Sequence, residues 1–154
     1  MTPLGCAEGI VDFIKERLEA NDELTNSGEK QYKVYTGFLT IGMSRSEIKD
    51  LAPAIIVRPT EVTDGEKETV AVIGIYITDY DEDRVEGCKT LFHIMEFLRF
   101  ELLTNNPIRM KYNIKSGSMI SSLPDEQPYP QWWGSIHFEV NLPQPKRNFS
   151  EVFQ

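Results

Sequence analysis

A first helix is predicted by apolar residues that recur at helical spacing between about Ala7 and Ala20. Charged residues fill the positions between them, so one side of this helix is expected to face a core and the other side water. Asn21 and Asp22 begin the loop that ends it. The apolar positions are Ile10, Val11, Phe13, Ile14 and Leu18.

Alternating or continuous apolar residues predict most of the remaining structure as β-strands. Residues 37–53 show no clear pattern, apart from a short helical turn at 46–50. In residues 69–78 both alternating sets are largely apolar, which predicts a central strand covered on both faces. The expected strands span residues 31–36, 54–58, 69–78, 109–114 and 133–142.

A β-hairpin is predicted where Asp64 and Gly65 separate two of these strands. The Asp-Gly pair tolerates the positive φ angles of tight hairpin turns. We therefore expect the strands on either side of it to run antiparallel. Asp64, Glu66 and Glu68 make the tip acidic, although Lys67 interrupts the run.

The strongest predicted helix follows the central strand and ends near Leu103, before Asn105, Asn106 and Pro107. Acidic residues at its start favour the positive end of the helix dipole, and one apolar stripe is expected to face the core. Further apolar residues make this apolar surface wider than the core requires. A helix that is apolar on more than one side is expected to be buried on more than one side, so the second cover is either another subunit or the chain's own loops. The stripe comprises Cys88, Leu91, Met95, Leu98 and Leu102; the second set comprises Phe92, Ile94, Phe97 and Phe100.

The order of these elements predicts an α+β fold, because strands in hairpins surround a long helix. We expect a mainly antiparallel sheet with two principal helices on one face and a protruding β-hairpin. The 154 residues fit one domain. It is expected to span residues 1–143, and residues 144–154 follow as an extended C-terminal arm, since Pro143 and Pro145 end the last strand.

The charge of the chain argues against tight binding of nucleic acid. The net charge is −8, and the 16 lysines and arginines form no cluster along the sequence. Proteins that grip phosphates normally present a basic patch. The longest apolar runs are also far shorter than the ~20 residues that a membrane-spanning helix needs.

Residues with catalytic or metal-binding chemistry are few and scattered. The two cysteines, Cys6 and Cys88, and the two histidines, His93 and His137, show no zinc-ligand spacing. No nucleophile elbow, phosphate loop or dinucleotide motif occurs. We therefore predict no enzymatic activity, no cofactor and no metal, although a Cys–His pair assembled in space stays open.

Acidic residues gather where the central strand leads into the long helix. Asp79, Asp81, Glu82 and Asp83 could serve a hard cation, but the EF-hand pattern is absent. Capping of the helix explains the same residues. His93 and Glu96 could share a helix face, yet the second pair that a di-iron bundle needs is missing.

A proline- and aromatic-rich segment precedes the last strand. Alternating prolines stiffen an extended chain, and aromatic side chains offer large contact area at low entropic cost. We expect Pro128, Tyr129, Pro130 and Trp132 to dock a partner or a neighbouring subunit, and Trp133 to point into the core. The alternative is that both tryptophans fill the end of the sheet.

Four motifs in order resemble small proteins encoded among the head–tail genes of tailed bacteriophages and prophages. They are Pro53–Arg58, Tyr80–Asp83 with Gly87, Glu96–Leu103, and Pro128–Gly134, and the resemblance covers roughly residues 34–143. The similar class is the tail terminator, or tail completion, protein. A head-closure or connector protein of the same neck region is the neighbouring alternative.

The resemblance implies a structural virion protein, located in the tail or neck and assembled in the host cytoplasm. Such proteins close the growing tail tube as a hexameric ring, which joins the tube to the head–tail connector. DNA would pass through the ring without tight binding. Because the apolar surface of the long helix is wider than one core stripe requires, Phe92, Phe97 and Phe100 are the residues expected to contact other subunits. The acidic hairpin tip would line the channel or dock on the outer rim. A different class also stays open, namely a small hydrolase using Cys88 or His137, or a ligand-binding module.

Overall fold

The structure is a computed structural model that describes residues 1–21, 31–38 and 45–145. These residues form a five-stranded sheet and three helices. The helices are α1 (Pro3–Ala20), α3 (Arg45–Leu51) and α4 (Arg84–Thr104). The strands are β1 (Lys33–Thr36), β2 (Ala54–Asp64), β3 (Thr69–Tyr80), β4 (Ile120–Ser122) and β5 (Gln131–Leu142).

Both long helices begin at polar caps that the sequence supplies. The hydroxyl of Thr2 accepts a hydrogen bond from the Gly5 amide at 3.0 Å, and Pro3 follows it, so α1 starts four residues earlier than its apolar pattern indicates. The carboxylate of Asp83 accepts from the amides of Val85 and Glu86 at 2.9 and 3.0 Å. This cap confirms the helix-capping interpretation for Asp83.

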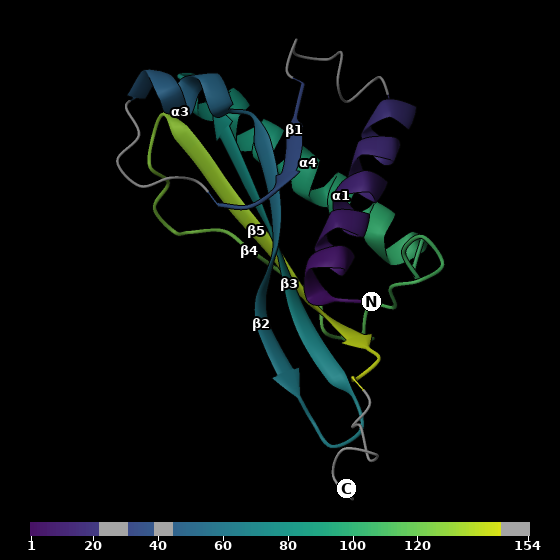
Figure 1. The fold of residues 1–154 in the computed structure, drawn as a ribbon. Helices are drawn as coiled ribbons and strands as arrows, with labels where there is room; N and C mark the ends of the chain where they lie inside the picture. The colour runs from purple at the N-terminus through teal and green to yellow at the C-terminus, as the bar shows by residue number, and fades with distance from the viewer. Residues whose placement is uncertain (22–30, 39–44, 146–154) are drawn as a thin grey trace, which may run out of the picture.

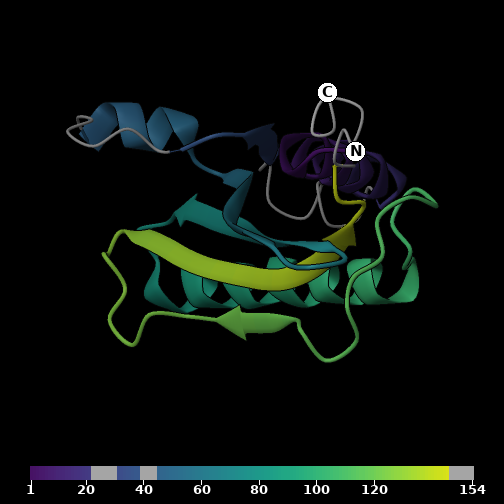
Figure 2. The same ribbon diagram turned by 60° about the horizontal axis from the view of Figure 1, so that its bottom comes forward.

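The sheet is mainly antiparallel, in the order β1-β2-β3-β5-β4. β1 runs parallel to β2, whereas β2, β3, β5 and β4 pair antiparallel with their neighbours. α1 packs against β1 and β2, and α4 runs along β3 and β5 (Figure 1; Figure 2). The α+β prediction is confirmed.

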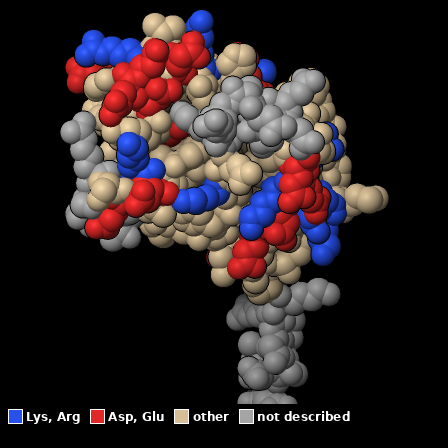
Figure 3. Space-filling model, turned by 90° about the horizontal axis from the view of Figure 1, so that it is seen from above, with Lys and Arg blue, Asp and Glu red and all other residues tan. Residues whose placement is uncertain are grey.

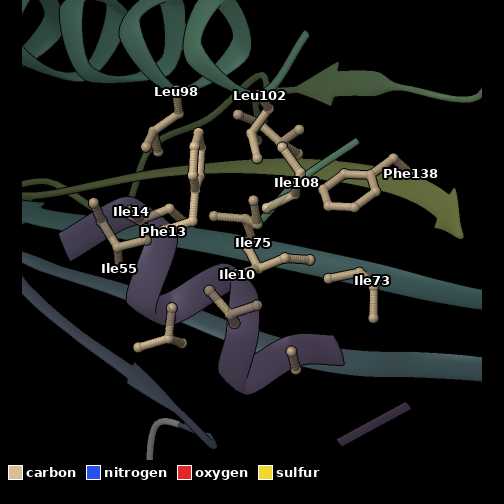
Figure 4. Packing of buried hydrophobic residues seen from close by; sticks show 14 of the residues in the cluster. Ile10, Phe13, Ile14, Ile55, Ile73, Ile75, Leu98, Leu102, Ile108 and Phe138 are labelled. Carbon is tan, nitrogen blue, oxygen red and sulfur yellow. The ribbon is translucent and has the colours of Figure 1, made fainter. Parts of the chain in front are cut away.

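One face of the sheet carries the hydrophobic core. In β3 the side chains of Ala71, Ile73, Ile75 and Ile77 are at most 2% exposed. Residues of α1 and α4 join them in a single cluster, and Figure 4 shows side chains of both helices gathered with those of the strands. The two principal helices therefore share one face of the sheet, as predicted. The residues labelled there are Ile10, Phe13, Ile14, Ile55, Ile73, Ile75, Leu98, Leu102, Ile108 and Phe138.

The opposite face of β3 is less covered than the sequence predicted. Val70, Val72 and Tyr76 are half-buried, whereas Gly74 and Thr78 are buried. The helices lie on the other side, so the expectation of a strand covered on both faces was wrong. Apolar residues on both sides of a central strand do not require two covering layers, since cross-strand neighbours shield part of each side chain.

The hairpin of β2 and β3 is present and extends beyond the helices at the bottom of Figure 1. A register shift between Pro59 and Glu61 interrupts the pairing, and residues 60–68 beyond it are exposed. Gly65 does not adopt a positive φ, so the prediction of the hairpin was right although its turn chemistry was not. The tip closes through the Gly65 amide, which donates to the Glu68 carbonyl at 2.9 Å.

Two expectations near the C-terminal half need correction. Residues 109–114 do not form a strand, because Arg109 and Met110 take positive φ angles of 52° and 58° and turn the chain back. The side chain of Asn106 holds the returning segment through the backbone of Ile114. β4 was not predicted, since its three residues are all exposed and leave no apolar pattern. Most of the predicted arm at 144–154 lies outside the described residues.

Replacing Leu102 should test the shared core. Leu102→Ala removes a fully buried side chain where α4 faces the sheet, and we expect a loss of about 2–5 kcal/mol in the free energy of unfolding. Leu103→Ala is the matched control, because Leu103 is 45% exposed and should change stability by less than about 0.5 kcal/mol. Urea titration of dilute protein measures both. Equal losses would contradict this placement of the core.

Candidate functional site

The outer side of α4 carries an uncovered apolar stripe. Val85, Phe92, Phe100 and Leu103 are 60%, 45%, 62% and 45% exposed. Their spacing of seven, eight and three residues places them on one side of the helix, opposite the buried core residues. We call these four residues the outer stripe.

The outer stripe only partly matches the predicted interface. Phe92 and Phe100 belong to it, but Phe97 is half-buried and packs against the core. Ile94, which the sequence grouped with the phenylalanines, is 2% exposed and lies within the core. Val85 and Leu103 were missed, although their helical spacing from Phe92 and Phe100 was the available signal.

The two tryptophans of the proline-rich segment are placed the opposite way round from the prediction. Trp132 is 9% exposed and its indole N–H donates to the Asp81 carbonyl at 3.0 Å, whereas Trp133 is 41% exposed. The Trp132 ring lies so close to Gly87 that a Cβ there would stand 2.3 Å from Nε1. The expectation of a surface Trp132 and a core Trp133 was therefore wrong.

The rest of this segment joins the start of α4 to the sheet. Pro130 is buried, Pro128 is half-buried, and Tyr129 is 46% exposed while its hydroxyl donates to the Glu82 carbonyl at 2.6 Å. The guanidinium of Arg84 stands 5.0 Å from the centre of the Tyr129 ring. Among the predicted docking residues, Tyr129 thus presents the largest surface, and Trp132 serves the core.

The acidic residues before α4 have local backbone partners. Asp81 accepts from the Asp83 amide at 2.9 Å, and Asp79, fully buried, accepts from the Tyr80 amide at 2.7 Å. In the parts of the chain that the structure describes, no three His, Cys, Asp or Glu side chains are grouped to hold a metal ion. His93 and Glu96 are both exposed on α4.

The hairpin tip is an exposed acidic ribbon. Glu66 and Glu68 are exposed, and Asp64 accepts a hydrogen bond from the Thr69 hydroxyl at 2.7 Å. The side-chain amide of Gln144 donates to the Gly65 carbonyl at 2.6 Å, which ties the end of the last strand to the tip. The exposed carboxylates of the hairpin therefore lie on a tip that this hydrogen bond attaches to the end of the last strand.

A pocket of about 210 Å³ lies on the open face of the sheet. Arg58 stacks between two rings, with its guanidinium carbon 4.4 Å from the centre of Phe38 and 3.8 Å from that of Tyr76. Gly74 makes room for this arrangement, since a Cβ there would lie 2.7 Å from the Tyr76 ring. We call it the Arg58 pocket; its lining residues are Phe38, Ile56, Arg58, Tyr76, Ile77, Thr78, Trp133 and Gly134.

Sequence reasoning missed the Arg58 pocket. Two signals were available, namely an arginine that ends an apolar strand and a lone glycine inside the clearest strand. His137 adjoins it, and its Nε2 lies 2.9 Å from the Tyr76 hydroxyl. Burial, and to a smaller degree the Arg58 guanidinium, lowers the pKa of His137.

The cysteines and His137 do not form a nucleophile pair. Cys88 packs against the core from the helix side, whereas His137 contacts Tyr76 on the open face of the sheet. Cys6 is fully buried, and this burial raises the pKa of its thiol to about 12. A thiol with such a pKa is protonated at neutral pH and is a poor nucleophile.

The positions of the tryptophans predict opposite effects of two neighbouring substitutions. Trp132→Ala empties the space beside Gly87, and we expect it to cost about 3–5 kcal/mol of stability. Trp133→Ala should leave the melting temperature nearly unchanged, because Trp133 is 41% exposed. Thermal unfolding followed by circular dichroism compares the two. A stable Trp132→Ala protein would contradict the buried position.

Two further observations bear on function. In the described part of the chain, no helix is long and apolar enough to cross a membrane. No protein-family model matches the sequence, and no curated protein matches it significantly.

Proposed function

We propose that the chain is a structural subunit of a phage tail, a tail terminator that assembles as a ring on the tail tube and joins the tube to the head connector. The order of four sequence motifs suggests this class. The observation that carries the proposal is the outer stripe of α4, because it supplies a surface for assembly. The proposed location is the neck of the virion.

The outer stripe has the composition of a surface that another protein covers. Isolated apolar residues on a surface are ordinary, but Val85, Phe92, Phe100 and Leu103 follow one side of a single helix over five turns. Exposed apolar residues that gather on one side of a helix are typical of a protein interface, and the exposed Lys89 and Glu96 lie among them. Two of the four are phenylalanines, whose large side chains contribute strongly to association.

The sheet offers a second surface for assembly. β1 pairs with β2 only from Ala54 to Val57. Among the described residues, the remainder of β2 therefore has no neighbouring strand on that edge. The exposed part of the hairpin belongs to this edge. Unpaired strand edges can pair with another chain, and β2 is therefore available to a neighbouring subunit or to a tube protein.

Self-association should depend on the outer stripe. The wild-type chain is expected to gain mass with concentration or when tail tubes are added, and Phe92→Ala with Phe100→Ala should weaken this at least about tenfold, because truncation of anchor aromatics commonly costs ~2 kcal/mol or more. Met110→Ala is the control, since Met110 is 92% exposed outside the stripe. Light scattering measures the mass.

The same experiment separates the candidate roles. Assembly that requires tail tubes supports a terminator, whereas assembly that requires connectors supports a head-closure protein. A chain that stays monomeric at all concentrations, with tubes and with connectors, would overturn the ring.

A ring on the tail axis should let DNA pass. Figure 3 shows acidic and basic side chains intermingled on the face seen from above, with no continuous basic patch on it. With a net charge of −8, we expect no retention of duplex DNA even at low salt, where electrostatic binding is strongest. Electrophoretic mobility shift measures retention. Submicromolar binding that weakens steeply with salt would contradict the passive channel.

A further inference from the structure

Arg58 is a half-buried cation with few partners. Its Nη1 donates to the Gly37 carbonyl at 3.3 Å, and no carboxylate among the described residues pairs with it. A guanidinium has five N–H donors, and its planar fork matches a carboxylate. The rings of Phe38 and Tyr76 flank the guanidinium, but they offer no oxygen acceptor for its remaining N–H groups. An anion in the pocket would supply one.

Thr78 lines the same pocket and is also incomplete. It is 4% exposed, and its hydroxyl has no hydrogen-bond partner in the described part of the chain. Buried polar groups are normally paired, so this hydroxyl is an unused donor at the wall of the pocket. A carboxylate can accept from both Thr78 and Arg58, while an apolar group fits the walls formed by Ile56 and Trp133.

The volume of the Arg58 pocket indicates what kind of ligand it can hold. Its volume of about 210 Å³ is below the roughly 300–1,000 Å³ typical of small-molecule sites. It also lies on an open sheet face rather than inside the domain. One or two side chains of a polypeptide fit this space better than a cofactor does, and they must combine a carboxylate with apolar atoms.

We propose that the hairpin tip of a second copy of this chain enters the Arg58 pocket, with Glu66 or Glu68 on the guanidinium and Val62 against the apolar wall. Residues 61–68 hold four carboxylates against one lysine, and Val62 is 45% exposed. The ribbon therefore carries both parts of the required ligand. This contact rests on the proposed ring and names the surfaces that would close it.

The contact has to join different molecules. The tip adjoins Thr69, whereas Arg58 pairs with Gly74, five residues along the same strand, which is about 17 Å. One chain therefore cannot fill its own pocket. Copies that join head to tail through these two surfaces produce rings when the rotation closes, whereas reciprocal exchange of tips would stop at a dimer.

Charge reversal tests the contact. Arg58→Glu alone, and Glu66→Lys with Glu68→Lys alone, should each raise the concentration needed for assembly at least about tenfold, and the protein carrying all three changes should recover, because attraction is restored with reversed signs. Lys111→Glu and Glu8→Lys with Asp12→Lys are controls, since these exposed residues lie outside both surfaces. Light scattering measures assembly, and circular dichroism confirms that each variant folds.

Mixing and an uncharged variant sharpen the result. In an equimolar mixture each Arg58→Glu protein can pair with a Glu66→Lys, Glu68→Lys protein through one native and one charge-reversed contact, so the mixture should assemble although neither protein assembles alone. Thr78→Val should weaken assembly without lowering the melting temperature, because it removes a hydroxyl that has no partner in the monomer. If Arg58→Glu does not fold, Arg58→Gln replaces it as a single variant, which should also weaken assembly, and the recovery test is not applied to it.

The outcomes separate the contact from the proposed function. Wild-type assembly that Arg58 and hairpin variants leave unchanged would overturn the contact and leave the ring standing. The contact would also be overturned if the Arg58 variant and the hairpin variant each weakened assembly and the protein carrying all three changes did not recover. The two changes would then act on separate interactions. A wild-type chain that stays monomeric with tubes and connectors would overturn the ring and the contact together.

Discussion

The packing of α1 and α4 against one face of the sheet decides which surfaces of the domain stay open. Ile73 and Ile75 are fully buried by this packing. Both helices are used on that face, so the opposite face keeps only its own cross-strand neighbours as cover. The outer side of α4 is left uncovered for the same reason. The open surfaces of the domain thus follow from the one-sided arrangement of the core.

The periodic elements could be predicted because burial leaves a repeating pattern in the sequence. The alternation in residues 69–78 and the stripe of α4 each report a surface that is almost wholly covered. Helix starts were predictable where a polar cap was recognised, as at Asp83. The outer stripe was partly predictable, because Phe92 and Phe100 exceed what one core stripe requires. Its exact members depend on where the sheet ends, which periodicity does not give.

The errors arose where local chemistry overrode the pattern. Trp132 lies four residues before Ile136, so the alternation of buried residues in β5 places it on the buried face together with Phe138. The sequence interpretation gave more weight to the adjacent prolines, which suggested a docking segment. Residues 109–114 alternate like a strand, yet the left-handed backbone at Arg109 turns the chain there. The Arg58 pocket joins residues from β2, β3 and β5 with Phe38, and only the sheet register brings them together.

Arg58 is difficult to explain as a contribution to the stability of the isolated domain. A cation that is half-buried between rings loses hydration, and a stacked arginine recovers part of that loss through its contact with the aromatic faces. An apolar residue there would cover Ile56 and Tyr76 without the loss, and Thr78 as valine would avoid an unpaired hydroxyl. A half-buried cation and an unpaired hydroxyl at one pocket are consistent with selection for a contact to another molecule. The acidic hairpin fits the same explanation, since its exposed carboxylates add nothing to the core and supply the charge that the pocket lacks.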